Sequence, residues 1–201
     1  MQRLRIAVLI SGSGSNLQAI IDAIENGHLP VELVCVISNR QAAFGLKRAE
    51  NVGIKAVYIG KGNYLDDKSR DEALLETLLS HNVDLVVLAG YLAILPSKVV
   101  NAFTNRIVNI HPSLIPLHCG PGYYGLHVHE SVIQSKDKVS GATTHFVDEG
   151  VDTGRVIYQE QIEVAYDDTA DSLAQKVLVI EHRLLVKTLY DISIGLVKIG
   201  N

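Results

Sequence analysis

The sequence has little of several features that mark specialised classes of protein. Its 201 residues include only two cysteines, Cys35 and Cys119, which are too few for a disulfide framework. No apolar run approaches about 18 residues, so no membrane-spanning helix is expected. Basic residues are not in excess, because the formal net charge is −4 at pH 7, and this argues against a nucleic-acid-binding surface. We therefore expect neither a membrane nor a nucleic acid as a partner.

The N-terminus carries no expected targeting segment. Its apolar stretch, residues 6–10, is too short for a signal peptide and is followed at once by alternating serine and glycine. This predicts a cytoplasmic protein. Hydrophobic residues make up 47% of the chain and charged residues 20%, which excludes disorder. The length fits one domain over residues 1–201 with a core of its own.

Apolar runs and helical patterns alternate along the chain. Continuous apolar runs predict strands buried on both faces at residues 6–10, 33–37, 55–59, 85–89 and 107–110. Two sets of apolar residues between these runs follow helical spacing: Leu17, Ile20, Ile21 and Ile24, and then Leu74, Leu75, Leu78 and Leu79, with Asp71 and Glu72 expected early in the second helix.

The C-terminal part predicts two more strands and one long helix. The strands are expected at residues 142–147 and 156–164 as antiparallel additions, and the helix is expected to begin near Asp171 or Ser172. Strands that alternate with helices form right-handed βαβ units. The predicted fold class is therefore α/β: a Rossmann-like, open, mostly parallel sheet with helices on both faces.

A glycine-rich loop, residues 11–16, follows the first strand and opens the first helix. Its glycines allow close backbone approach, and free N–H groups at a helix N-terminus suit a phosphate. The alternative is a turn that caps its own helix with Ser15 or Asn16. Leu17 replaces the third glycine of a dinucleotide fingerprint, and no acid follows the second strand, so a dinucleotide is disfavoured. A P-loop is absent from the sequence.

An Asn-x-His-Pro motif follows the predicted fifth strand. Asn109 and His111 lie two residues apart and so point the same way in an extended strand, while Pro112 restricts His111 to extended geometry. An amide donor beside an imidazole can stabilise a developing oxyanion. The alternative is a structural Asn and His at the start of a loop.

An acidic loop, residues 148–154, follows the expected strand at 142–147. It has a catalytic role only if one of its carboxylates reaches His111, whose pKa it would raise. His127 and His129 are a possible zinc-binding pair, but neither C-x-x-C nor H-E-x-x-H accompanies them. We expect no metal.

These motifs together resemble the folate-dependent formyltransferases, and among them the phosphoribosylglycinamide formyltransferase family. The segments that carry the resemblance are residues 11–20, 37–40, 84–91, 109–116, 145–147 and 152–154. Each motif alone is moderately specific, whereas their order and spacing are very specific. The resemblance implies the formyltransferase fold, with a phosphate-binding half at 1–100 and a catalytic and folate-binding half at 101–201. It also implies transfer of a formyl group from 10-formyltetrahydrofolate to the amine of phosphoribosylglycinamide in purine biosynthesis, without a metal.

The resemblance also implies roles for particular residues of this chain. The catalytic residues would be Asn109, His111 and Asp152, with Asp152 as proton relay. The substrate phosphate would lie at Gly14, Ser15 and Asn16, and Glu181 would contact the substrate. The folate site would comprise Lys68, Leu92, Ala93, Ile94, Leu95, Asn109, Asp148, Glu149, Gly150, Val151 and Asp152.

The chain departs from the family pattern at three places. Ala93 stands where many members have arginine, and the loop at residues 117–124 is longer than the short family form. Near position 68, Arg70 competes with Lys68 for the folate tail. Two other functions stay open: a sister enzyme such as a formyltetrahydrofolate deformylase, and a non-catalytic phosphometabolite-binding protein. The chain is expected to be a monomer or a homodimer.

Overall fold

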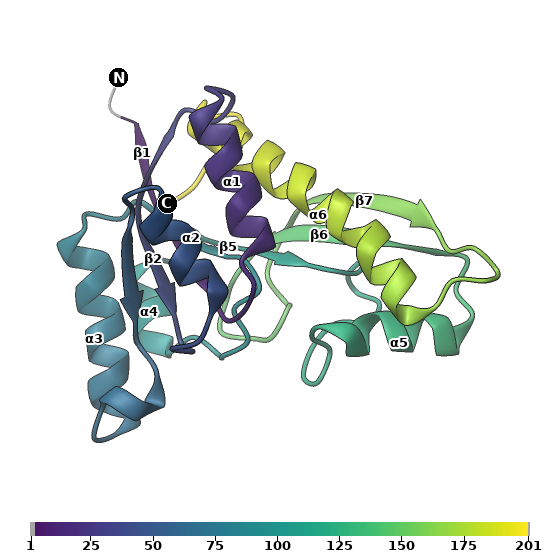
Figure 1. The fold of residues 1–201 in the computed structure, drawn as a ribbon, viewed down its shortest axis with the longest axis horizontal. Helices are drawn as coiled ribbons and strands as arrows, with labels where there is room; N and C mark the ends of the chain where they lie inside the picture. Colours follow the sequence, from purple (N-terminus) through teal and green to yellow (C-terminus); the bar gives the residue numbers. More distant parts are fainter. Residues whose placement is uncertain (1–2, 201) are drawn as a thin grey trace.

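The computed structural model describes residues 3–200 and is built around one seven-stranded sheet (Figure 1). Its strands lie in the order β3-β2-β1-β4-β5-β6-β7, and the first five are parallel. Strands β6 and β7 are antiparallel additions at one edge. The strands are β1 (Leu4–Ile10), β2 (Val31–Ser38), β3 (Lys55–Tyr58), β4 (Leu85–Leu88), β5 (Ile107–His111), β6 (Val139–Phe146) and β7 (Val156–Glu163). The predicted open, mostly parallel sheet is confirmed.

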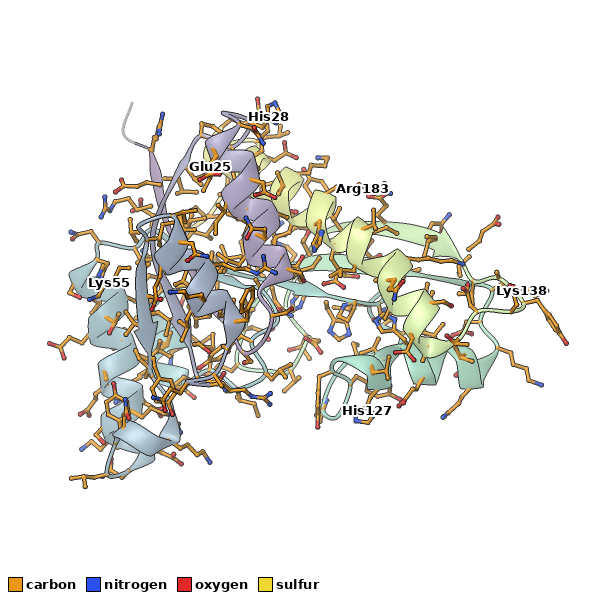
Figure 2. All side chains as sticks on the ribbon, viewed as in Figure 1. Glu25, His28, Lys55, His127, Lys138 and Arg183 are labelled. Carbon is orange, nitrogen blue, oxygen red and sulfur yellow. The ribbon has the colours of Figure 1, made fainter. Side chains whose placement is uncertain are left out.

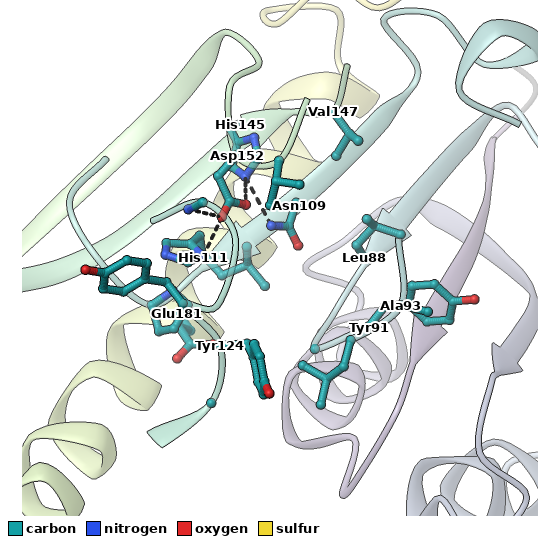
Figure 3. A pocket seen from close by; sticks show the side chains of 18 of the residues that line it. Leu88, Tyr91, Ala93, Asn109, His111, Tyr124, His145, Val147, Asp152 and Glu181 are labelled. Carbon is teal, nitrogen blue, oxygen red and sulfur yellow. Dashed lines mark hydrogen bonds and ion pairs between the residues drawn. The ribbon is translucent and has the colours of Figure 1, made fainter. Parts of the chain in front are cut away.

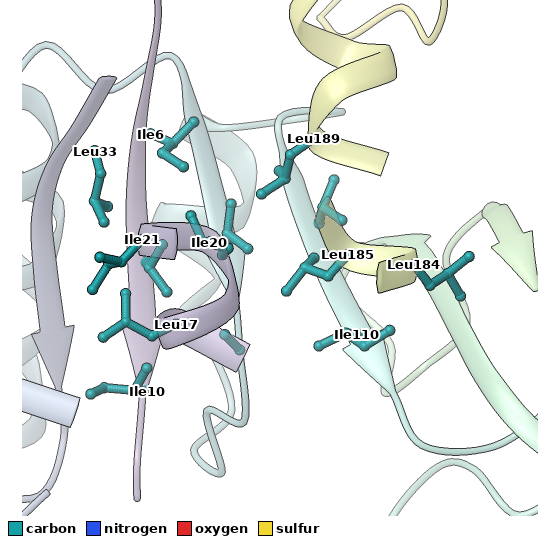
Figure 4. Close-up of a cluster of buried hydrophobic side chains, with 14 of the residues drawn as sticks. Ile6, Ile10, Leu17, Ile20, Ile21, Leu33, Ile110, Leu184, Leu185 and Leu189 are labelled. Atoms are coloured by element: carbon teal, nitrogen blue, oxygen red, sulfur yellow. The ribbon is translucent and has the colours of Figure 1, made fainter. Parts of the chain in front are cut away.

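Helices cover both faces of this sheet, as predicted. They are α1 (Ser15–Glu25), α2 (Phe44–Asn51), α3 (Asp67–Ser80), α4 (Ser97–Ala102), α5 (Leu126–Ser135) and α6 (Ala170–Ser193), with a 3-10 turn, η1 (Lys61–Asn63). Apolar side chains of α1, α2, α5 and α6 pack on one face, where Leu17, Ile20, Leu185 and Leu189 meet β1 and β5 (Figure 4). Helices α3 and α4 pack on the other face. The strands at 6–10 and 85–88 are continuous apolar runs because both of their faces are covered.

Side-chain caps define the starts of helices α3 and α6, and the start of α6 lies next to the expected Asp171. Helix α3 begins at Asp67, and its N-cap is Asp66, whose Oδ1 accepts a hydrogen bond from the backbone N–H of Ser69 at 2.7 Å. Asp71 and Glu72 therefore follow the first turn and lie early in this 14-residue helix, as expected. Helix α6 begins at Ala170, because Thr169 and Ser172 form a reciprocal capping box. Side-chain caps therefore determine where α3 and α6 begin.

The strand order places a switch point between β1 and β4. From β1 the chain runs outward through β2 and β3, and it then returns to build β4 and β5 on the other side of β1. At such a point the loops after the two central strands separate and leave a crevice at the carboxyl ends of the strands. Parallel pairing of β4 with β5 joins the halves at 1–100 and 101–201 in one sheet.

Both cysteines are free. Cys35 lies fully buried in β2, and burial raises the pKa of its thiol to about 11, so it is an inert core residue. Across residues 3–200, no helix combines the length and apolar character needed to cross a membrane.

Candidate active site

A cavity of about 730 Å³ opens at the carboxyl ends of the central strands. The glycine loop after β1 contributes Ser13, Ser15 and Asn16, and β5 contributes Asn109 and His111. The two motifs therefore face one crevice, as the sequence predicted. Residues of the acidic loop, of the loop before α5 and of helix α6 complete the wall: Asp148, Glu149, Gly150, Val151, Asp152, Gly120, Pro121, Gly122, Tyr123, Tyr124 and Glu181.

The glycine loop is shaped by its contact with α2. Gly14 is the N-cap of α1 with φ 70°, and no side chain caps this helix, so the alternative of a Ser15 or Asn16 cap is wrong. A Cβ at Gly14 would lie 2.7 Å from the Cα of Gly45, whose N–H donates to the carbonyl of Gly12 at 3.1 Å. The fold therefore requires glycine at position 14 even without a ligand.

Arg48 of α2 holds the other side of this loop. Its Nε donates to the carbonyl of Ser13 at 2.8 Å, and its Nη1 donates to Gln18 at 2.8 Å. The N–H groups of Ser15 and Asn16 belong to the first turn of α1. They have no partner within the helix, because the first N–H groups of an α-helix lack a preceding turn of carbonyls. Backbone donors at the positive end of a helix dipole form an anion site.

The side chain of Asn16 has a protein partner that the sequence did not indicate. Its Nδ2 donates to Glu181 Oε2 at 2.8 Å, and both side chains are buried. Burial raises the pKa of Glu181 to about 7, although the hydrogen bond from Asn16 opposes this shift. Within residues 3–200 the buried Oδ1 of Asn16 has no hydrogen-bond partner. The loop thus offers a phosphate its backbone N–H groups, while one amide N–H of Asn16 is bound to the carboxyl group of α6.

Asn109 is oriented by a histidine of the neighbouring strand. Strand pairing sets Asn109 opposite His145, and Asn109 Nδ2 lies 3.1 Å from His145 Nε2 (Figure 3). His145 Nδ1 lies 2.8 Å from the carbonyl of Phe146, which only accepts. The proton of a neutral His145 is therefore on Nδ1, so Nε2 accepts from Asn109. A primary amide has two N–H groups, and the second one of Asn109 is left for a ligand in the cavity.

His111 is buried between the carbonyl of His118 and the carboxylate of Asp152. Its Nε2 donates to the carbonyl of His118 at 2.9 Å, and its Nδ1 lies 3.6 Å from Asp152 Oδ2. Burial lowers the pKa of His111, and the charge of Asp152 only partly opposes this. The sequence predicted a raised pKa, and this was wrong because burial outweighs the neighbouring carboxylate. At rest the neutral form is favoured, with Nδ1 free to accept a proton.

Asp152 reaches the site from the acidic loop, in a left-handed backbone conformation (φ 57°). Its Oδ2 accepts the N–H of Gly120 at 2.9 Å, and its Oδ1 lies 3.5 Å from His145 Nε2. Burial acts to raise the pKa of Asp152, but the hydrogen bond from His145 in its protonated form, the charges of protonated His111 and His145, and the N–H of Gly120 together lower it below its ordinary value. Asp152 is therefore ionised at neutral pH. Asp148 instead closes its own loop, accepting from Thr153 Oγ1 at 2.6 Å.

The remaining wall of the cavity is apolar and partly exposed. Leu92 is 45% exposed and Ile94 82% exposed, whereas Leu95 is buried. A second hollow of about 620 Å³ adjoins this wall and shares Tyr91, Ala93 and Ile94 with it. Its basic residues are Arg40, Lys61 and Arg70. Lys68 is exposed on α3 and lines neither cavity, so the structure does not bring it to the other site residues.

Two histidines of the cavity had no role assigned from the sequence. His145 contacts both Asn109 and Asp152, and only the β5–β6 register reveals this. His129 is buried in the cavity wall, and burial lowers its pKa to about 4. His127 points outward and contacts Glu130 at 3.0 Å (Figure 2), so it does not pair with His129. No metal-ligand group of three or more His, Cys, Asp or Glu side chains occurs in the described part of the chain.

Comparison with known proteins agrees with this geometry. A family model described as "Formyl transferase" matches residues 4–189. A phosphoribosylglycinamide formyltransferase of Haemophilus influenzae is 42% identical over 170 residues, which cover 84% of this chain and 77% of that protein. A trifunctional purine biosynthetic protein adenosine-3 of Chironomus tentans is 40% identical over 98% of this chain, and the chain spans 14% of its length. A glycinamide ribonucleotide transformylase 1 structure from Symbiobacterium toebii aligns with a TM-score of 0.91 at 40% identity, covering 99% of this chain and 92% of that one.

The fold and the site together define a Rossmann-like α/β protein with an Asn–His–Asp group and a glycine loop in one crevice. The chain belongs to the formyl transferase family.

Proposed function

We propose that this chain transfers a formyl group from 10-formyltetrahydrofolate to the amine of phosphoribosylglycinamide, a step of purine biosynthesis. The observation that carries the proposal is the joint placement of Asn109, His111 and Asp152 in one cavity with the glycine loop. The names of the relatives support this choice of substrate. The two partners proposed are therefore small molecules, and a cytoplasmic location stays a prediction.

Direct attack accounts for the chemistry. The substrate amine attacks the formyl carbon, a carbon–nitrogen bond forms, and the formyl oxygen becomes an oxyanion. The free N–H of Asn109 donates to that oxyanion. Nδ1 of neutral His111 accepts the proton that the amine loses, and Asp152 stabilises the imidazolium that results. The same proton then passes to the folate nitrogen as its bond to the formyl carbon breaks.

The phosphate end of the substrate is proposed to lie on the N–H groups of Ser15 and Asn16. The amine end then extends along the cavity toward Glu181 and His111, which line the same wall. Glu181, with its pKa of about 7, can exchange a proton near neutral pH and accept a hydrogen bond from the glycinamide group.

The folate is proposed to bind between residues 92–95 and 148–152. Leu92, Ile94 and Leu95 supply apolar contact, and the acidic loop supplies backbone donors and acceptors. Ala93 borders both hollows and leaves room where a larger side chain would stand. The second hollow then suits the acidic tail of the folate, and Arg70 is the better candidate for it than Lys68.

A formyl-transfer assay tests this proposal. The purified chain is given 10-formyltetrahydrofolate with or without phosphoribosylglycinamide, and release of tetrahydrofolate is followed at the folate chromophore. We expect release only when the ribonucleotide is present, and we expect His111→Ala to abolish it. Release without ribonucleotide would show a deformylase. Binding of the ribonucleotide without any turnover would show a non-catalytic phosphometabolite-binding protein.

A further inference from the structure

The loop between β5 and α5, residues 112–125, contacts the catalytic group through its backbone. The carbonyl of His118 accepts from His111 Nε2 at 2.9 Å, and the N–H of Gly120 donates to Asp152 Oδ2 at 2.9 Å. Residues 118–120 therefore determine which nitrogen of His111 bears the proton, and they also stabilise the negative charge of Asp152. A carbonyl cannot donate, so the bond from His118 fixes the neutral His111 as its Nε2–H form and leaves Nδ1 free toward Asp152.

The side chain of His118 is fixed by two residues outside the catalytic group. Its Nδ1 lies 2.8 Å from Ser131 Oγ of α5, and its Nε2 lies 2.6 Å from Asp137 Oδ2. The imidazole of His118 is 12% exposed, and the ring of Tyr123 packs edge-on at 6.3 Å between centroids. Each ring nitrogen thus has a partner, and the ring cannot turn without losing one of them.

The backbone at His118 also needs such support. Its φ is 50°, in the left-handed region, which is strained for a residue with a Cβ. Asp137 is itself fixed beyond the end of α5, where its N–H donates to the carbonyl of Val132 at 3.3 Å. The end of α5 therefore fixes Asp137, and Asp137 fixes the side chain of His118. The strained backbone of His118 is in this way kept in contact with the imidazole of His111.

We propose that His118 is a positioning residue for His111 and Asp152, and that Asp137 and Ser131 act through it. This inference rests on the proposed function only for its kinetic readout. Neither Asp137 nor Ser131 lines the cavity. Their effect is on the tautomer and the position of His111.

The test compares Asp137→Asn with Glu130→Gln. The control removes the charge from a second histidine–acid pair, His127 with Glu130 at 3.0 Å. This pair lies on α5, the helix that carries Ser131, and it points outward. Two readouts are taken at several pH values: kcat and KM for formyl transfer, and the imidazole ¹⁵N chemical shifts of His111, identified by their loss in His111→Gln. The shifts report which ring nitrogen bears the proton and need no turnover.

We expect Asp137→Asn to lower kcat by about tenfold to a hundredfold with little change in KM for the ribonucleotide, because a small misplacement of a catalytic group has effects of this size. The His111 shifts should move away from the Nε2–H pattern, and Glu130→Gln should change neither readout. Ser131→Ala, which removes only one of the two contacts, should give a smaller change of the same kind, and it replaces Asp137→Asn if that variant does not fold.

Wild-type His111 shifts and wild-type kcat in both folded variants would overturn the proposal. So would a lower melting temperature with unchanged His111 shifts, because it would show a purely structural role. If the wild-type chain transfers no formyl group, the proposed function fails, whereas the ¹⁵N shifts still decide whether His118 positions His111.

Discussion

Asn16 and Glu181 lie 165 positions apart in the sequence and are joined by a hydrogen bond of 2.8 Å. The bond links the first turn of α1, next to the phosphate loop, to the middle of α6. It places a buried carboxyl group with a raised pKa in the cavity that the proposed phosphate site and the catalytic group also line. A direct hydrogen bond therefore joins the proposed phosphate end of the substrate site to Glu181, the proposed contact of the glycinamide end.

The first prediction concerns the pH dependence of stability at Glu181. Its pKa is about 7 in the folded chain against an ordinary value of 4.5, so between these pH values the folded state binds more protons than the unfolded state. The free energy of unfolding must then fall as pH rises through this window, by about 3 kcal/mol at most. Glu181→Gln keeps the shape of the side chain but cannot ionise, so its free energy of unfolding should not show this decline. Relative to wild type, the variant should therefore become more stable as pH rises from 5 to 8.

Urea denaturation across this pH range measures the difference. Glu76→Gln, at an exposed glutamate of α3, is the matched control and should follow wild type. If the free energies of unfolding of wild type and Glu181→Gln changed with pH in parallel, the prediction would be wrong. Glu181 would then be ionised in the folded chain without a cost from burial.

The second prediction concerns Asp152. Asp152→Asn keeps the shape and removes the charge that raises the pKa of His111, so that pKa should fall further below its ordinary value. Because His111 acts as a base, the acid limb of the rate profile should move to lower pH while the plateau falls about 10²-fold or more. Single-turnover formyl transfer from pH 5 to pH 9 measures both effects.

The double variant of His111→Ala with Asp152→Asn should lose little more activity than His111→Ala alone, because the two residues act as a unit. Asp167→Asn, at an exposed position, serves as the control. Additive losses, or a folded Asp152→Asn variant with normal turnover at every pH, would remove Asp152 from the mechanism.

The third prediction compares two glycines of the phosphate loop. Gly14→Val places a β-branched residue at φ 70° and drives its Cβ toward Gly45, so we expect a stability loss of about 2 kcal/mol or more. In the folded fraction, phosphoribosylglycinamide should bind more weakly while folate binding changes little. Gly12→Ala, where a Cβ meets nothing within 4 Å, should retain both affinities and the stability.

Thermal melting and calorimetric titration of each ligand separate these effects. Equal weakening of both ligands by Gly14→Val would show that the loop has only a structural role.

The fourth prediction distinguishes Arg70 from Lys68. Arg70 lines the second hollow and is paired with Asp67 at 2.6 Å and Asp71 at 2.8 Å, so it is already ordered. Arg70→Ala should raise KM for 10-formyltetrahydrofolate about tenfold, because a charge-assisted contact to the glutamate tail is lost. Lys68→Ala should leave KM near the wild-type value, because Lys68 lines neither hollow.

A formyl donor that lacks the glutamate tail provides the internal check. Arg70→Ala and wild type should use it equally well. If Lys68→Ala raised KM as much as Arg70→Ala does, the prediction would be wrong. The glutamate tail of the folate would then contact Lys68, outside both hollows.

The sequence by itself determined the sheet and one edge of the site. Apolar runs predict strands because a parallel sheet buries both faces of each strand, and this pattern is local. The same locality placed Asn109 beside His111, since side chains two apart on a strand point the same way. Likewise, a glycine loop between a strand and a helix must lie at the carboxyl end of that strand.

Only the tertiary structure decided the partners of these residues and their charge. The pairing of Asn109 with His145 depends on the β5–β6 register, and the bond from Asn16 to Glu181 depends on how α6 crosses α1. The pKa of His111 was predicted in the wrong direction because burial is a property of the whole packed chain, while a neighbouring acid is visible in the sequence. Loop 112–125 likewise shows its contacts only when the chain is folded, because desolvation and long-range hydrogen bonds leave no local pattern.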